Sequence, residues 1–379
     1  MGKIKKGKDK MKKGKKGLVF FVLMIVAITV GIALTGCSKS DDKKVDSTTK
    51  QKETTTTVDQ VNAITSEWEK SPHGTPSPDE DQTVFTYTQD KPCEPCHNGN
   101  ALAGDGTYKS TKNVINNPND TTNNKMYNSK TAELPTTMGC ATCHSGLGAQ
   151  IMDSGVIPAA QNTITSLLAE WDVGNQNALC FTCHNGRRDV EADYAKWTGA
   201  TASSGAHFYE YPHHGWNALV TGKGVEYPGV KYPQNDAHMK TGCVGCHMVQ
   251  TADGYVSHNL KPNTDTCKKC HGSSVKNFED FSKKSRENIE KKLETLKPLI
   301  FAKAAPVFNA TKIVAWYAPL QDASGKEISE DELKKLPGDV LIAIYNYTIV
   351  EQEIGEGGKG IHNPKYANAL LDESIKRLK

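Results

Sequence analysis

Ten of the eleven cysteines occur in pairs, and in each pair the cysteines are separated by two residues and followed directly by a histidine. The five segments are Cys93, Cys96 and His97; Cys140, Cys143 and His144; Cys180, Cys183 and His184; Cys243, Cys246 and His247; and Cys267, Cys270 and His271. Two cysteines three positions apart lie about one helical turn from each other. Both can form thioethers with one haem, and the following histidine can bind the iron as its proximal ligand. The pattern therefore predicts five covalently attached haems c.

Other uses of paired cysteines explain the pattern less well. Disulfides are common in exported proteins, but they give no reason for a histidine after every pair. Zinc ribbons also use two cysteines separated by two residues, but they do not need a histidine at the fifth position each time. Haem attachment accounts for every member of the repeat.

Each iron also needs a second axial ligand or keeps an open face. Seven histidines lie outside the five motifs: His73, His207, His213, His214, His238, His258 and His362. A single histidine is most often a surface or core residue, but seven in a chain of this size, most of them near the motifs, favour ligation. Five of the seven would give every iron two histidines. The sequence does not indicate which distal histidine meets which iron.

The N-terminus has the pattern of an export signal. Residues 3–16 contain nine lysines and one aspartate, and an apolar run from Leu18 to Leu34 follows. The segment Leu34-Thr35-Gly36-Cys37 has the form of a lipobox, in which Cys37 would carry a diacylglycerol anchor. The apolar run has 17 residues, which is near the lower limit for a membrane-spanning helix, so an uncleaved anchor is the alternative. Either reading predicts an exported protein held at the cell envelope, on its periplasmic or cell-surface side.

The charge balance depends on whether this signal is counted. The whole chain has a formal net charge of +3, but from Cys37 onward 37 Lys and Arg stand against 42 Asp and Glu, which gives −5. No basic face suggests nucleic acid as a partner. An acidic surface could suit basic or metal-rich partners, although a solvated surface is the simpler explanation.

Composition divides the chain into four parts. Residues 1–36 are predicted to be a lipoprotein signal peptide, and residues 37–66, which have almost no large apolar side chains, a disordered tether. Residues 67–275 would form the pentahaem cytochrome c domain, in which haems replace much of the core and regular secondary structure is sparse. Residues 276–379 contain no cysteine and would form a C-terminal helical region that closes on a haem. The expected fold class is mainly α with extensive irregular loops.

Three helices are expected in the last hundred residues. Residues 282–300 carry Ile289, Leu293, Leu296 and Ile300 at helical spacing. A second helix should run from Pro337-Gly338-Asp339 to about Glu353, after a capping box formed by Ser329 and Glu332. The third should begin at Asn363-Pro364 as N-cap and first-turn proline. Its packed side would carry Ala367, Leu370, Leu371, Ile375 and Leu378.

Residues 67–379 resemble the multihaem cytochromes c of respiratory and metal-reducing bacteria. The similar segments are Glu67-Trp68-Glu69-Lys70-Ser71-Pro72-His73, Tyr211-Pro212-His213-His214-Gly215, and Gly360-Ile361-His362-Asn363-Pro364-Lys365-Tyr366-Ala367. His238 and His258, which precede the last two motifs, also stand where the family places distal ligands. The resemblance implies distal ligation by His73, one of His213 and His214 with His213 preferred, His238, His258 and His362. His207 would be a loop residue.

With two histidines on every iron, no haem could bind a substrate directly, and electron transfer is the expected function. The partners would be other redox proteins or periplasmic or extracellular electron acceptors. One alternative is a reductase of nitrite or a sulfur oxyanion with one open haem, near which Arg187 and Arg188 could bind an anion or pair with haem propionates. Nitrite reductases of this kind carry lysine in place of histidine in one motif, and all five motifs here end in histidine. Another alternative is a subunit of a haem-bearing filament or surface complex.

Overall fold

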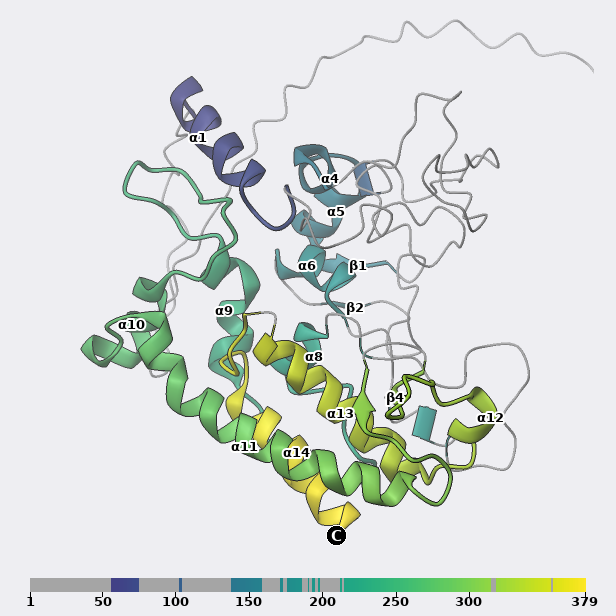
Figure 1. Cartoon of the computed structure of the whole chain (residues 1–379). Helices are drawn as coiled ribbons and strands as arrows, with labels where there is room; N and C mark the ends of the chain where they lie inside the picture. Colours follow the sequence, from purple (N-terminus) through teal and green to yellow (C-terminus); the bar gives the residue numbers. More distant parts are fainter. Residues whose placement is uncertain are drawn as a thin grey trace, which may run out of the picture. The chain divides into compact units, whose positions relative to one another are not determined.

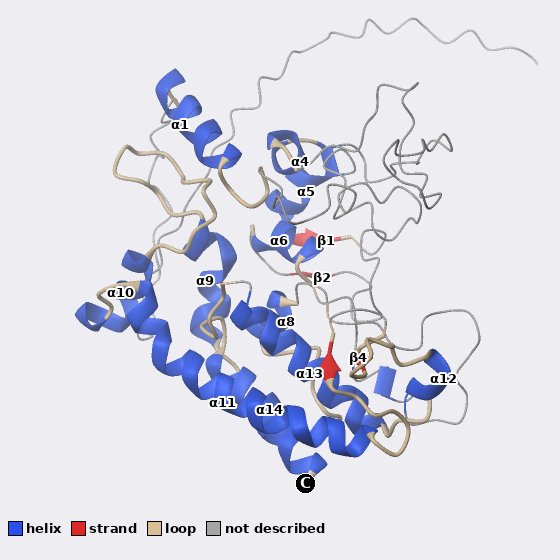
Figure 2. Cartoon of the chain, in the orientation of Figure 1, coloured by secondary structure: helices blue, strands red, loops and turns tan. Residues whose placement is uncertain are grey.

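The computed structural model describes residues 56–74, 102–103, 138–158, 171–172, 176–185, 190, 193–194, 197, 212, 215–314, 318–355 and 357–379. Over these residues the chain is mainly helical, with short helices and irregular loops before residue 275 and longer helices after it (Figures 1 and 2). The predicted fold class, mainly α with extensive loops and a C-terminal helical region, is confirmed.

The part before residue 275 contains short elements. They are α1 (Val58–Glu69), α4 (Cys140–His144), α5 (Gly146–Ser154), β1 (Val156–Ile157), β2 (Trp171–Asp172), α6 (Asn177–Cys183), α8 (Trp216–Thr221), α9 (Asp236–His247), α10 (Thr264–His271) and the 3-10 turn η3 (Gly272–Ser274). β1 and β2 pair antiparallel, with Val156 opposite Asp172 and Ile157 opposite Trp171. The described cysteine pairs lie in α4 and in the last turns of α6, α9 and α10.

The C-terminal region contains three longer helices that pack on one another: α11 (Phe278–Ala304), α13 (Gly338–Gly355) and α14 (Pro364–Leu378). Between α11 and α13 lie the antiparallel strands β3 (Lys312–Ile313) and β4 (Leu320–Gln321) and the short helix α12 (Glu330–Leu333). The predicted capping features are confirmed, because Ser329 and Glu332 form a capping box and the Asn363 side chain accepts the backbone N–H of Tyr366 at the start of α14.

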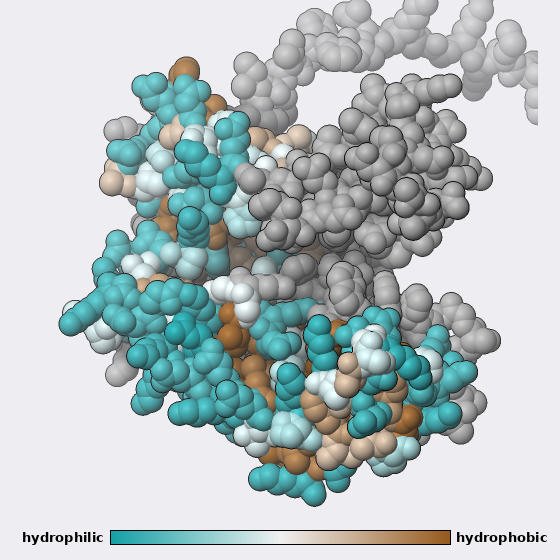
Figure 3. Space-filling model, in the orientation of Figure 1, coloured by the Kyte–Doolittle hydropathy of each residue, from teal (hydrophilic) through white to brown (hydrophobic). Residues whose placement is uncertain are grey.

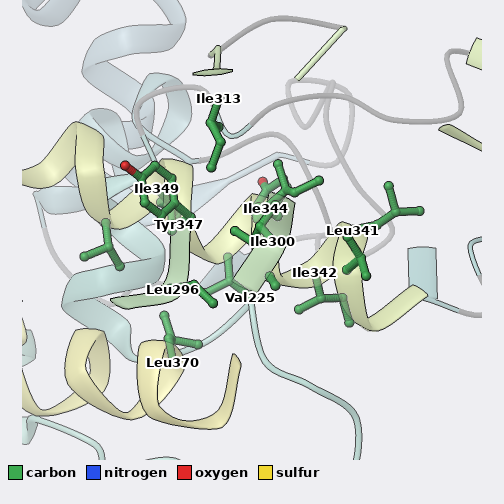
Figure 4. Close-up of a cluster of buried hydrophobic side chains, with 14 of the residues drawn as sticks. Val225, Leu296, Ile300, Ile313, Leu341, Ile342, Ile344, Tyr347, Ile349 and Leu370 are labelled. Atoms are coloured by element: carbon green, nitrogen blue, oxygen red, sulfur yellow. The ribbon is translucent and has the colours of Figure 1, made fainter. Parts of the chain in front are cut away.

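The packed faces also match the sequence pattern. Ile289, Leu293, Leu296 and Ile300 are buried on α11, while α13 is buried on nearly all sides. Figure 4 shows the side chains of α13 that meet Leu296 and Ile300 of α11, Leu370 of α14 and Val225. The same core includes Val190, Trp197, Leu219 and Tyr227. The C-terminal helices are therefore packed on residues from the cysteine-containing part of the chain.

The disordered tether predicted over residues 37–66 was wrong in its last nine residues. Helix α1 begins at Val58, so residues 58–66 are helical although composition assigned them to a disordered segment. The Thr57 and Gln60 side chains form a capping box, and Gln60 Nε2 donates to the carbonyl of Asp253 at 2.7 Å. Local capping and this distant contact outweigh the low apolar content of the segment. The rest of the tether, the signal peptide and Cys37 lie outside the described residues.

Within the described part of the chain, no helix is both long enough and apolar enough to cross a membrane. The face drawn in Figure 3 is mainly hydrophilic over α10 and the first turns of α11. The apolar residues of α11 instead point toward α13 and α14.

Candidate haem sites

Four proximal histidines of the cysteine motifs each face one histidine from elsewhere in the chain. The distances between ring centres are 5.9 Å for His184 and His73, and 6.1 Å for His144 and His258. They are 6.3 Å for His271 and His238, and 6.3 Å for His247 and His362. All four facing partners belong to the predicted set of distal ligands.

This spacing fits an iron between the two rings. An imidazole nitrogen binds a transition metal at about 2 Å, and that nitrogen lies about 1 Å from its ring centre, so two histidines on opposite sides of one iron have centres roughly 6 Å apart. Among the described residues, no group of three or more His, Cys, Asp or Glu could hold a metal ion. A pair of protein ligands suits an iron whose other four positions belong to a porphyrin, and does not suit tetrahedral zinc.

Ring hydrogen bonds orient these histidines. His238 Nδ1 lies 2.8 Å from the carbonyl oxygen of His362, His258 Nδ1 2.8 Å from that of Val256, and His247 Nδ1 2.6 Å from that of Leu260. A carbonyl can only accept, so Nδ1 carries the proton and Nε2 keeps a free lone pair for a metal. Partners of this kind orient the ring and set the tautomer of a metal-binding histidine.

His362 differs because its Nδ1 meets a carboxylate. The distance to Glu353 Oε2 is 2.6 Å, and Glu353 is 1% exposed in the last turns of α13. Burial alone would lower the pKa of His362, but the Glu353 carboxylate outweighs it and raises that pKa. Glu353 was not singled out by sequence reasoning, and nothing in its spacing marks it as a partner of His362.

Two of the proximal histidines, His144 and His247, are favoured in the neutral form that binds a metal. Burial lowers the pKa of His144 and of His247, and the facing distal histidine lowers each further. The neutral ring is the form that donates its lone pair to iron.

A second carboxylate positions the segment that contains His258. Glu67, at the end of α1, accepts hydrogen bonds from Tyr255 Oη at 3.0 Å, Ser257 Oγ at 2.9 Å and the backbone N–H of His258 at 2.8 Å. Burial alone would raise the pKa of Glu67, but these hydrogen bonds outweigh it and lower that pKa. In the sequence, Glu67 is only the first residue of the segment that ends in His73. The structure connects it to His258 instead.

The described cysteines adjoin one another from motif to motif. The Cys180 and Cys243 side chains lie close enough to interact, and so do those of Cys143 and Cys180. Cys246 and Cys267 interact in the same way. Burial, followed by these neighbours, raises the pKa of Cys143 and that of Cys246 to about 11. The described cysteines of the second to fifth motifs therefore follow one another in space in the order of the sequence. Cys270 is disulfide-bonded in the structure, so its thioether to haem stays a prediction.

Local backbone geometry brings the third and fourth motifs together. Gly242 interrupts α9 directly before Cys243, with φ 60° and ψ −166°. Asn177 Oδ1, at the start of α6, accepts the backbone N–H of Val244 at 2.9 Å. A side chain at position 242 would collide with Asn177. Trp216 then stacks on His184 with ring centres 4.6 Å apart and lies 6.4 Å from His362.

Several predicted site residues lie outside the described residues. They are the first motif with Cys93, Cys96 and His97; His207, His213 and His214; Arg187 and Arg188; and Cys37. The predicted ligand roles of these residues stay predictions.

The comparisons with known proteins agree with this geometry. The family model for cytochrome c552 matches residues 87–379, which cover more than half of the chain. No curated protein and no solved structure matches the chain.

Proposed function

Because the chain belongs to the cytochrome c552 family, and so is a multihaem c-type cytochrome with covalently bound haem c, we propose that it is an envelope-anchored electron carrier whose five haems each have two histidine ligands. The observation that carries the proposal is the set of four histidine pairs with ring centres 5.9–6.3 Å apart. Each pair joins one cysteine motif to one predicted distal ligand.

In this proposal the haems are ligated by His184 with His73, His144 with His258, His271 with His238, and His247 with His362. The first motif, with proximal His97, is left for His213 or His214. Haem supplies one-electron redox chemistry when bound. The chain itself contributes the axial ligands, their hydrogen-bonded orientation and the close succession of attachment sites.

An electron carrier needs redox sites that are near one another and closed to substrates. Two protein ligands on an iron leave it no free position for a substrate. The adjoining cysteines of the second to fifth motifs would keep neighbouring haems close. Both features favour transfer along the chain over catalysis at one iron.

The anchoring part of the proposal comes from the N-terminus. Export is typical of this family, and the lipobox ending at Cys37 would attach the mature chain to a membrane through acyl chains. Its partners would be redox proteins or electron acceptors on the same side of the envelope, as in anaerobic or extracellular respiration.

The test is electron paramagnetic resonance of the oxidised full-length protein, purified in detergent with its haems attached. A haem-to-protein ratio of five and low-spin signals from all five irons are expected. A high-spin signal from one iron per protein would contradict the carrier and indicate a reductase with an open haem. Binding of nitrite or a sulfur oxyanion to that iron would then be measured. Two single variants, His213→Ala and His214→Ala, should identify the distal ligand of the first haem. The variant that lacks this ligand should show a high-spin iron, and the other should stay fully low-spin.

A further inference from the structure

Glu353 is a buried carboxylate at a position where a negative charge does not stabilise its helix. It lies in the last turns of α13, where the C-terminal end of the helix dipole disfavours negative charge. It is 1% exposed. Lys359, six residues later, pairs with Glu279 instead. A buried acidic group in such a place needs a specific partner.

His362 is that partner, and both its ring and its backbone N–H contact the carboxylate. Its Nδ1 lies 2.6 Å from Glu353 Oε2, and its backbone N–H lies 3.4 Å from Oε1. Gly358 provides the space, because a Cβ at that position would overlap the carboxylate oxygens. The turn between α13 and α14 therefore holds Glu353 directly against His362.

Two other distal histidines, His238 and His258, have neutral acceptors for their ring hydrogen bonds. His238 Nδ1 meets the carbonyl of His362, and His258 Nδ1 meets the carbonyl of Val256. A carboxylate accepts a stronger, charge-assisted hydrogen bond than a carbonyl. The His362 ring is therefore the more electron-rich ligand.

We propose that Glu353 is a positioning residue that fixes the orientation of His362 and gives the haem attached at Cys243 and Cys246 a lower reduction potential than the haems ligated by His238 and His258. This inference rests on the proposed function, because it takes His362 as the distal ligand of that haem. Oxidised iron carries one more positive charge than reduced iron. A carboxylate on its ligand therefore stabilises the oxidised form preferentially, and burial strengthens the effect.

The experiment compares the holoprotein with Glu353→Gln and with Glu351→Gln by potentiometric titration monitored by electron paramagnetic resonance. Glutamine keeps an oxygen that can accept from Nδ1 but removes the charge. Glu351, exposed on the same helix, is the matched control because its loss removes a charge without touching His362. In Glu353→Gln we expect the haem ligated by His362 to become about tenfold easier to reduce, which is about 59 mV for one electron. Its low-spin g values should change, and Glu351→Gln should leave both quantities unchanged.

Unchanged potentials and g values in Glu353→Gln, or an equal shift in Glu351→Gln, would overturn the inference. If Glu353→Gln does not assemble, His362→Ala provides a second test. The signal that it converts to high spin should be reduced, in the wild type, after the two signals that His238→Ala and His258→Ala convert, and an earlier reduction would contradict the inference. A high-spin iron in the wild-type protein would instead contradict the proposed function, so the two failures can be distinguished.

Discussion

In four histidines of the described chain, one ring nitrogen makes a hydrogen bond and the other is left for a metal. In His238, His247 and His258, Nδ1 is held by a backbone carbonyl, and in His362 it is held by a carboxylate. The remaining nitrogen of each ring is available to iron. A surface or core histidine has no reason to face a second histidine at this spacing as well. The shared arrangement supports ligation more strongly than the presence of histidine alone.

His258 gives a direct test of one proposed pair. His258→Ala should convert one iron from low spin to high spin and leave the other four low-spin, because His144 would lose the ring that faces it at 6.1 Å. The measurement is electron paramagnetic resonance of the oxidised holoprotein. His207→Ala is the matched control, since it also removes an imidazole but His207 is expected to be a loop residue and no ligand. A fully low-spin spectrum in His258→Ala would exclude this pairing.

Glu67 should also make stability depend on pH. Its folded pKa lies below the ordinary glutamate value, so its contribution to stability is present above that ordinary value and is lost as the pH falls through the folded pKa. We expect Glu67→Gln to lower the free energy of unfolding at pH 7 by about 1 kcal/mol. Urea denaturation from pH 7 to pH 3 should show the difference between the two proteins shrinking with acid. A difference that stays constant would mean that the carboxylate charge is not involved.

The sequence predicts which residues are candidates but not how they pair. Three of the four facing pairs join residues more than 100 positions apart, and no local pattern encodes such a contact. Cysteine and histidine can be recognised because few other roles require them together. Glu353 and Glu67 could not be recognised, because a glutamate in a helix is usually a solvated residue and only the folded chain shows its partner.

At the scale of elements, local rules predicted the C-terminal helices well. Apolar spacing located the buried face of α11, and Asn363 with Pro364 marked the start of α14. The same reasoning failed at α1, where low apolar content suggested disorder. The Thr57–Gln60 capping box is local and could have been noticed, but the contact from Gln60 to Asp253 could not.

Two glycines that directly precede cysteine motifs should respond differently to alanine. Gly242 has φ 60° and ψ −166°, a backbone conformation that costs about 1–3 kcal/mol for other residues, and an added Cβ would also strike Asn177. Gly139 has φ −123° and open space around it. Gly242→Ala should therefore lower stability by at least about 1–3 kcal/mol and reduce haem attachment at Cys243 and Cys246. Gly139→Ala should be nearly neutral.

Urea denaturation and the haem-to-protein ratio measure these two effects. Gly139→Ala serves as the matched control, since it also places a methyl group directly before a cysteine motif. Equal losses in the two variants would mean that any residue before a motif impedes attachment. The contact between α6 and α9 at Gly242 would then not be what matters.

At the scale of the whole molecule, the C-terminal helices do more than supply one ligand. Their core includes Val190, Trp197, Leu219 and Tyr227, so residues between the third and fourth motifs are packed against α11, α13 and α14. Tyr227 Oη lies 3.1 Å from the carbonyl of Asp339 and 3.2 Å from Ser374 Oγ. Folding of the C-terminal region therefore also organises the segments between the third and fourth motifs.

The location of the carrier depends on one cysteine that has no role in haem binding. Cys37→Ser should prevent lipid attachment while leaving all five cysteine pairs intact, so the variant should hold five haems but move from the membrane fraction to the soluble exported fraction. Acyl chains provide the membrane affinity of a lipoprotein, and the hydroxyl of serine cannot replace the thioether. Cell fractionation with haem staining measures the distribution, and detergent-phase partitioning measures the anchor itself. If Cys37→Ser remains in the membrane fraction, the apolar run from Leu18 to Leu34 is retained as a spanning anchor. The electron carrier would then be tethered through its own chain, and its haem sites would be unaffected by the difference.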